Sequence, residues 1–216
     1  SIEDPVEFVT DEFNQIAVQP AVDLTFISAL RHVLRQDPDI IMVGEVRDEE
    51  TARSAMRSAL TGHLVLSTIH TNDTATTAIR LIDMGIEPYL IASTLVGVVA
   101  QRLMRTVCES CAEEYRPSPA VLSALGIDPG ESVTLRRGKG CRSCRGTGYK
   151  GRTGIFEVMK MTEELREALT GGSSVDHVRK MARNQGMTTL RENARAKVLE
   201  GRTTPEEMVR VTAVNV

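Results

Sequence analysis

Apolar runs alternate with amphipathic stretches along the first half of the chain, and this pattern predicts a parallel α/β sheet. The stretch DIIMVGE holds four apolar residues in a row, Ile40–Val43, as in a strand buried on both faces. Residues 64–69 (LVLSTI) form a second β-rich run. Between the two runs, residues 49–61 repeat apolar positions on one helical face, and Gly62 follows as a stop signal. Strands and helices in this order are typical of a parallel sheet covered on both faces.

Three more helices are predicted around these strands. Residues 24–35 form an amphipathic pattern that Asp37-Pro38 closes, because the residue before a proline disfavours the helical conformation. Asp73 is placed to cap a helix that ends near Gly85. Residues 88–105 carry apolar side chains most of the way round a helix, so we expect one long and well packed helix there.

The chain changes character after this point, which suggests three parts. The middle part holds all four cysteines and is rich in Gly, Pro, Arg and Lys. Short helical patterns follow it, and Thr203-Thr204 before Pro205 is the start signal of the last of them. We therefore expect a sheet domain, a cysteine-containing subdomain and a C-terminal helical subdomain, over residues 1–105, 106–154 and 155–216.

Composition and charge narrow the class of protein. The chain of 216 residues is 41% hydrophobic and 25% charged, as is ordinary for a soluble globular protein. Its net charge of −3 argues against a nucleic-acid partner, which needs a basic surface. Apolar runs are too short for a membrane span, so we expect a cytoplasmic protein. The start, SIEDPVEF, resembles the end of a strand whose beginning has been cut away, so we also expect a fragment.

The four cysteines form two C-x-x-C pairs, CESC at 108–111 and CRSC at 141–144. Disulfides are unfavoured in a cytosolic protein, whereas two such pairs bring four thiolates to one tetrahedral point, as structural zinc requires. Glycines after the second pair allow backbone N–H groups to turn toward the sulfurs. We expect a structural Zn²⁺ site, with metal-free thiols or a redox pair as the alternative; its candidate ligands are Cys108, Cys111, Cys141 and Cys144.

Polar residues follow three of the predicted strands. Glu3 and Asp4 follow Ile2, Glu45 follows the first apolar run, and His70 follows the second. Ligands bind beyond the carboxyl ends of the strands in an open parallel sheet, so neighbouring strands would bring these groups together. Carboxylates there suit a hydrated Mg²⁺ and the polarisation of an attacking water.

These residues also have less specific interpretations. A lone glutamate at a strand end is often a helix cap or a surface group. His63 follows Thr61-Gly62 and could simply close the preceding helix. Arg31, Arg35 and Arg47 are more often solvated charges or surface ion pairs than ligands. A glycine-rich phosphate loop is missing, because the one Gly-Lys pair, at 138–139, lacks the rest of the pattern.

Several segments together resemble one family, the type II secretion and type IV pilus assembly ATPases, in their C-terminal part. The resemblance runs over most of residues 1–160, and the helical tail is similar but less distinctive. The segments stand in the family's order: SIEDPVEF, RQDPDIIMVGEVRDEET, TGHLVLSTIHTND, AQRLMR and the paired C-x-x-C with GYKGRTGIFEV.

The resemblance implies a truncated RecA-like P-loop NTPase core of α/β class, with a zinc-stapled subdomain and a C-terminal helical bundle. It implies ATP hydrolysis with Mg²⁺ at the subunit boundaries of a homo-hexamer. Glu3 is similar to the acid that polarises water and Glu45 to the acid on the Mg²⁺ side, although either could be the base. His63 and His70 would couple the terminal phosphate to ring motion, and Arg152 is a weaker candidate for nucleotide contact.

The resemblance also implies partners and a location. The motor would act at the cytoplasmic face of the inner membrane, with a membrane platform and cytoplasmic docking proteins. The tetracysteine segment is similar to the assembly motors rather than the retraction motors, and the family's phosphate loop lies upstream. Secretion and pilus assembly stay open, as does a second hypothesis of a different class: a zinc-stapled protein-binding module without catalysis of its own.

Overall fold

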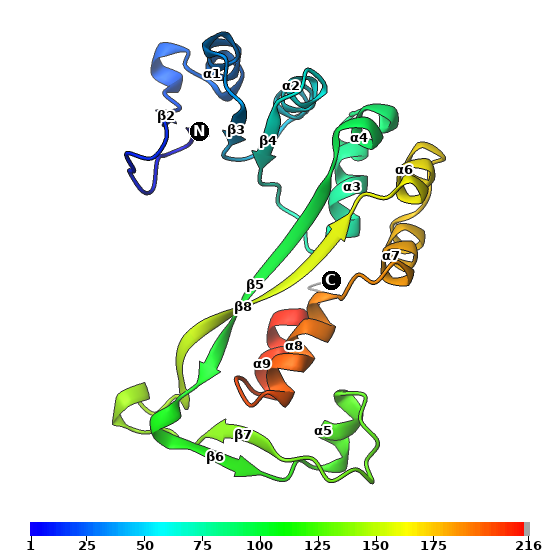
Figure 1. Cartoon of the computed structure of the whole chain (residues 1–216). Coiled ribbons are helices and arrows are strands. Elements are labelled where there is room, and N and C mark those ends of the chain that lie inside the picture. The colour runs from blue at the N-terminus through cyan, green and yellow to red at the C-terminus, as the bar shows by residue number, and fades with distance from the viewer. Residues whose placement is uncertain (214–216) are drawn as a thin grey trace. The chain divides into compact units, whose positions relative to one another are not determined.

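The computed structural model describes residues 1–213 as two compact units (Figure 1). The first unit contains residues 1–98 and 159–184, and the second contains residues 99–158 and 185–213 of the described chain. The two units do not coincide with the three parts expected from the sequence. The division of the chain into three domains stays a prediction. Within the described residues no helix is long and apolar enough to cross a membrane.

The first unit is built on a parallel sheet of four short strands. The strands are β1 (Ile2–Glu3), β2 (Ile16–Ala17), β3 (Ile40–Val43) and β4 (Leu64–Ser67), in the spatial order β2-β1-β3-β4. Both predicted apolar runs are therefore strands, and they are neighbours, with Ile40 opposite Leu64 and Val43 opposite Ser67. The order also places β1 against β3, as the convergence of polar strand ends requires.

Two helices cover one face of this sheet. Helices α1 (Phe26–Val33) and α2 (Glu49–Leu60) pack there, and their Leu30 and Ala55 share a core with Ile41 and Val43. The opposite face is apolar yet open among the described residues: Ile40 is 61% exposed, and Leu64 and Leu66 are 50% exposed. The expectation of helices on both faces is therefore met on one face only.

The remaining helices of the first unit start at the capping signals that the sequence carries. The Asp73 side chain accepts a hydrogen bond from the Thr76 N–H at 2.7 Å, as predicted, and Thr162 caps the first helix after the cysteine segment. Gly62 takes a positive φ of 105° after α2, which confirms it as the stop. These helices are α3 (Thr74–Asp83), α4 (Pro88–Thr94), α6 (Glu163–Thr170) and α7 (Val175–Asn184).

The long helix expected over residues 88–105 is wrong. Helix α4 ends at Thr94, and residues 97–107 form strand β5 (Gly97–Val107), which pairs with β8 (Tyr149–Lys160). The physical reason is local: Gly97 lies among the β-branched Val96, Val98 and Val99, which disfavour a helix and suit a strand. A Cβ at Gly97 would lie 3.1 Å from the Met159 carbonyl oxygen, so the glycine also allows a close approach to β8.

The second unit packs helices and an antiparallel pair of strands around its own core. Its elements are β6 (Ala112–Tyr115), α5 (Pro119–Ala124), β7 (Leu135–Gly138), α8 (Leu190–Leu199) and α9 (Pro205–Thr212). Met104, Ile155, Val198 and Met208 are buried together in this core. Thr204 caps α9 as predicted. Short 3-10 turns complete the chain at residues 20–22, 34–36, 109–111 and 142–144.

Candidate functional site

The carboxyl ends of β3 and β4 are tied together just beyond the sheet. The Val46 N–H donates to the Thr68 carbonyl at 2.8 Å, and the Thr68 hydroxyl donates to the Gly44 carbonyl at 2.7 Å. Thr68 therefore bonds to the residue on either side of Glu45. These bonds continue the register of the two strands into their loops, so Glu45 and the loop that carries His70 leave the sheet next to each other.

Glu45 is the centre of a small charged cluster at this edge. Its side chain is 14% exposed, and its two oxygens have different partners. One oxygen lies 2.5 Å from an Arg47 nitrogen, and the other lies 3.5 Å from His70 Nε2. A largely buried carboxylate is costly unless a cation compensates its charge, and Arg47 supplies that cation. The Arg47 contact is thus a pairing with Glu45 rather than a purely solvated charge.

Glu3 reaches the same sheet edge but faces other partners. The Ser1 hydroxyl donates to Glu3 Oε1 at 2.5 Å, and the Gln15 side chain donates to the same atom at 3.1 Å. Hydrogen bonds from Ser1 and then Gln15 lower the pKa of Glu3 below its ordinary value, so the group is ionised at neutral pH. Ser1 directly precedes β1 and Gln15 directly precedes β2, whereas the partners of Glu45 come from the loops after β3 and β4.

A close backbone contact joins β1 to the end of β3. The Gly44 N–H donates to the Ile2 carbonyl at 2.7 Å, and a Cβ at Gly44 would lie 2.9 Å from that oxygen and 3.4 Å from the Glu3 Cα. Glycine is therefore the residue that lets the two strand ends approach. The structure brings Glu3, Glu45 and His70 to one edge of the sheet, with direct contact between the side chains of Glu45 and His70.

His63 and Arg152 lie elsewhere in the fold. His63 immediately precedes the amino end of β4, whereas His70 follows its carboxyl end. The Nδ1 of His63 donates to the Ser58 carbonyl at 2.9 Å. His63 thus closes helix α2, as the less specific interpretation of this residue allows. Arg152 is an exposed residue of β8 in the second unit. The roles of both residues in nucleotide chemistry stay predictions.

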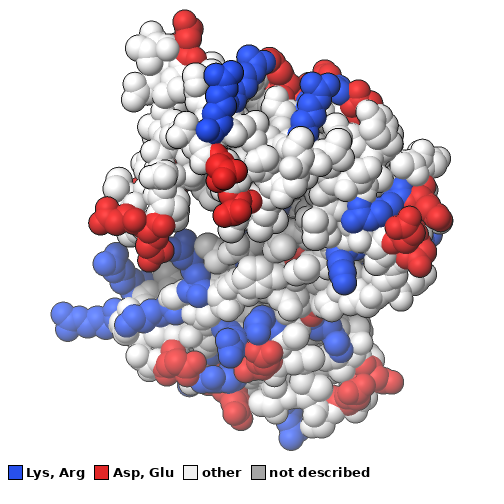
Figure 2. All heavy atoms as spheres, turned by 45° about the horizontal axis from the view of Figure 1, so that its top comes forward, with Lys and Arg blue, Asp and Glu red and all other residues white. Residues whose placement is uncertain are grey.

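Other charged groups around the sheet form surface pairs. Arg31 lies 3.7 Å from Glu50, and both side chains are about two-thirds exposed or more, at 72% and 68%. Such pairs contribute little because water screens them. Figure 2 shows that basic and acidic side chains both lie on the face of the molecule that it presents. The cluster at Glu45 differs from these pairs because its carboxylate is largely removed from water.

The four cysteines come together in the second unit, and their sulfurs all lie within 4.8 Å of one another. Sulfur–sulfur distances are 3.9 Å for Cys108–Cys141, 3.9 Å for Cys111–Cys144 and 3.8 Å for Cys141–Cys144. A tetrahedron with metal–sulfur bonds of about 2.3 Å has edges of about 3.8 Å, whereas a disulfide would need about 2.05 Å. The geometry therefore fits a four-thiolate metal site and excludes disulfides.

Backbone N–H groups support this cluster. The N–H groups of Cys141 and Gly148 donate to the Cys144 sulfur at 3.1 and 3.3 Å, which confirms the predicted role of a glycine after the second pair. The Cys141 N–H, opposed by burial and helped by Gly148, lowers the pKa of the Cys144 thiol to about 6. A Cβ at Gly138 would lie 2.1 Å from the Gly148 carbonyl oxygen, so only glycine fits where β7 meets the second pair.

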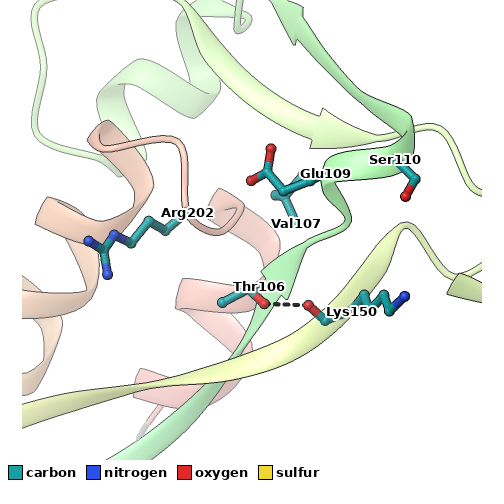
Figure 3. A pocket seen from close by; sticks show the side chains of 6 residues that line it. All are labelled: Thr106, Val107, Glu109, Ser110, Lys150 and Arg202. Atoms are coloured by element: carbon teal, nitrogen blue, oxygen red, sulfur yellow. Dashed lines mark hydrogen bonds between the residues drawn. The ribbon is translucent and has the colours of Figure 1, made fainter. Parts of the chain in front are cut away.

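A shallow pocket lies beside the cysteines, and Figure 3 shows the side chains that line it. The Thr106 hydroxyl donates to the Lys150 carbonyl at 2.6 Å across its floor. Glu109 is already paired with Arg136 at 2.7 Å. The lining is of mixed charge. The pocket is lined by Thr106, Val107, Glu109, Ser110, Lys150 and Arg202.

Some residues of the sheet-edge site could not be chosen from the sequence alone. Thr68 is one of several threonines near His70, and only the register of β3 and β4 selects it. Gln15 reaches Glu3 over a loop with no recognisable spacing. Arg47 is an exposed residue paired with Glu45, in line with the surface ion pair that the sequence allows, and its position two residues after Glu45 is the signal for this pairing.

Known proteins resemble this chain over nearly its whole length. The sequence is 50% identical over 211 residues to the type IV pilus assembly ATPase PilB of Thermus thermophilus, which covers 97% of this chain and 24% of the relative. It is 48% identical over 212 residues to the type II secretion system protein E of Pseudomonas aeruginosa, which covers 98% of this chain and 42% of the relative. The chain thus spans less than half the length of these relatives.

Solved structures agree with this result. The pilus retraction motor PilT with bound ADP superposes with a TM-score of 0.69 at 24% identity, over 99% of this chain and 52% of that one, and bears on the fold alone. The ATPase DotB of Legionella pneumophila superposes with a TM-score of 0.64 at 26% identity, over 96% and 49%. The family described as "Type II/IV secretion system protein" matches residues 1–210, and this chain belongs to that family.

Proposed function

We propose that this chain supplies the acidic and histidine-bearing side of an ATP-hydrolysing site in a motor ATPase for type II secretion or type IV pilus assembly. The observation that carries the proposal is the largely buried Glu45, at the carboxyl end of a parallel strand, with His70 Nε2 at 3.5 Å. The relatives include secretion and pilus assembly proteins, so both branches remain within the proposal.

The sheet edge suits the chemistry of such a site. Carboxylate oxygens are the ligands that Mg²⁺ prefers, and Glu45 offers them at an edge where Arg47 is the present counter-charge. When bound, Mg²⁺ would neutralise charge on the phosphates of ATP. Glu3 is our candidate for accepting a proton from the attacking water, with Glu45 as the alternative. His70 is 89% exposed and is free to contact a terminal phosphate.

Other parts of the motor follow from the family rather than from this chain's geometry. The proposal includes a RecA-like core, a phosphate-binding loop in the remaining length of the relatives, and a homo-hexamer with sites at subunit boundaries, to which Arg152 contributes. It includes a cytoplasmic position at the inner membrane, a membrane platform and docking proteins. His63 would act indirectly, because it lies at the opposite edge of the sheet from His70.

The cysteine cluster is proposed to hold one structural Zn²⁺. Four sulfurs at tetrahedral spacing, with no imidazole or carboxylate among them, leave no open position for a substrate. The ion would hold together residues 106–154, where helix and strand are short and glycine is frequent.

Glu45→Gln in the complete protein tests the motor proposal. The substitution keeps the shape of the side chain but removes its charge and one acceptor oxygen, so ATP turnover should fall by about 100-fold or more while the protein stays folded. Glu50→Gln is the matched control, since Glu50 is an exposed member of a surface pair, and it should leave turnover unchanged. Unchanged turnover in Glu45→Gln together with normal assembly would instead favour a zinc-stapled binding module.

A further inference from the structure

The loop that carries His70 is anchored at both of its ends. It runs over residues 68–73, between β4 and α3. Its first residue, Thr68, bonds to both neighbours of Glu45, as described above. The carboxylate of its last residue, Asp73, accepts hydrogen bonds from two partners, and one of these partners comes from a distant part of the sequence.

Asp73 divides its carboxylate between two helices. One oxygen accepts the Thr76 N–H at 2.7 Å and caps α3, while the other accepts a hydrogen bond from Arg179 Nη2 at 2.8 Å. Arg179 belongs to α7, which packs against α3, and its other terminal nitrogen donates to Asp176 at 2.6 Å. The Asp73 and Arg179 side chains are 23% and 35% exposed, so water screens this pair less than an exposed one.

His70 itself has little packing that would hold it. Its side chain is 89% exposed, and Glu45 at 3.5 Å is too far for a strong hydrogen bond. The Thr71 hydroxyl lies 2.6 Å from the Thr77 hydroxyl and ties the middle of the loop to α3 as well. The position of the imidazole is therefore set by the anchors of its loop rather than by contacts of the ring.

We infer that Arg179 is a positioning residue that holds the loop over residues 68–73, through Asp73, so that His70 stays beside Glu45. The inference rests on the proposed function for its consequence, because His70 matters only where a phosphate is bound. Helix α7 ends at Asn184, directly before the chain enters the second unit at Gln185. The ion pair thus also links the last helix of the first unit to the loop of His70.

Amide hydrogen exchange on the 216-residue chain tests the positioning itself. Arg179→Ala should speed exchange at residues 68–73 by about fivefold while strands β3 and β4 keep their protection. Arg179→Lys, which retains a cation, should recover most of the protection. Lys180→Ala is the matched control. Lys180 is the next residue and is exposed, and its substitution removes the same charge. Equal exchange in Arg179→Ala and Lys180→Ala would overturn the inference.

ATP turnover by the complete protein tests the consequence. Arg179→Ala should lower kcat about tenfold with KM for ATP unchanged, because it would displace His70, which under the proposed function would face the terminal phosphate. In a His70→Ala background the same substitution should have no further effect on kcat, since both changes act on one group. An additional tenfold loss in that background would show that Arg179 acts by another route and would overturn the inference.

The two measurements separate this inference from the motor proposal. A complete wild-type protein without ATP turnover refutes the proposed function, and hydrogen exchange then decides alone whether Arg179 holds the loop. Turnover that depends on Glu45 but not on Arg179 leaves the motor proposal standing and refutes the positioning role.

Discussion

The cysteine cluster and the sheet-edge site differ in how much of each lies within this chain. All four cysteine sulfurs, and the N–H groups that donate to one of them, come from one stretch of the second unit. The sheet edge, by contrast, gathers carboxylates and imidazole from three separate strand ends. The sequence holds no glycine-rich phosphate loop to accompany them. The proposed metal site is thus complete in one segment, whereas the proposed phosphoryl-transfer site depends on pairing between strands distant in the sequence.

Disruption of the proposed zinc site should separate the two regions most strongly. A structural zinc site contributes about 10 kcal/mol of apparent binding free energy to folding. Cys144→Ser removes a buried sulfur that accepts two N–H groups, so residues 108–148 should lose amide protection while β3 and β4 keep theirs. Hydrogen exchange with metal analysis by mass spectrometry measures both effects.

The wild-type chain provides the reference for this experiment. We expect about one zinc ion per chain, and a strong chelator should reproduce the exchange pattern of Cys144→Ser. A metal content near zero in a chain whose residues 108–148 remain protected would contradict the zinc proposal. Loss of protection in β3 and β4 as well would contradict the independence of the two regions.

A buried carboxylate in the second unit should give the next largest effect. Glu207 is fully buried at the start of α9, and it accepts hydrogen bonds from Arg105 and Arg210 at 2.7 and 2.6 Å. Arg105 in turn stacks on the Tyr149 ring at 4.2 Å. Glu207→Gln leaves two cations without their partner, so it should cost about 3 kcal/mol in urea unfolding. The adjacent exposed Glu206→Gln should cost less than about 0.5 kcal/mol.

The pH dependence of this effect has a definite sign. Burial would raise the pKa of Glu207, but hydrogen bonds from Arg210 and Arg105 outweigh it and lower the pKa from 4.5 to about 2. The stabilisation by ionised Glu207 is therefore fully present above pH 4.5 and is lost as pH falls toward 2. The stability difference between wild type and Glu207→Gln should shrink over that range, and a constant difference would argue against this pairing.

Much of the fold could be predicted from local patterns. Ile40–Val43 and residues 64–67 are strands, and Asp73, Gly62 and Thr204 start or end helices, because each signal acts on its immediate neighbours. The wrong prediction of one long helix over residues 88–105 also came from a local pattern. Apolar residues on every side fit a buried helix and a strand equally well, and Gly97 with its β-branched neighbours should have decided for the strand.

The site was predictable as a list of strand ends but not as a set of contacts. Parallel strands bring their carboxyl ends to one edge, so Glu3, Glu45 and His70 could be grouped from the sequence. The division of partners, with Gln15 on Glu3 and Arg47 on Glu45, depends on loop conformations that no spacing encodes. The same is true of Arg179, which lies 106 residues from Asp73.

The smallest of these effects tests the sheet edge through its backbone. Gly44→Ala places a methyl group 2.9 Å from the Ile2 carbonyl, and a backbone atom cannot yield as a flexible side chain does. The substitution should cost about 1–3 kcal/mol in urea unfolding and should displace β1, with Glu3, from β3. Gly130→Ala is the control, because its methyl group would meet only the Asp128 side chain, at 3.3 Å. If Gly44→Ala is as stable as Gly130→Ala, and the Gly44 N–H of the wild-type chain exchanges as fast as an unprotected amide, the close approach of the ends of β1 and β3 does not exist in solution. Glu3 and Glu45 would then be two unrelated polar groups. The sheet edge would not be a site at all, and could no longer be compared with the cysteine cluster as one.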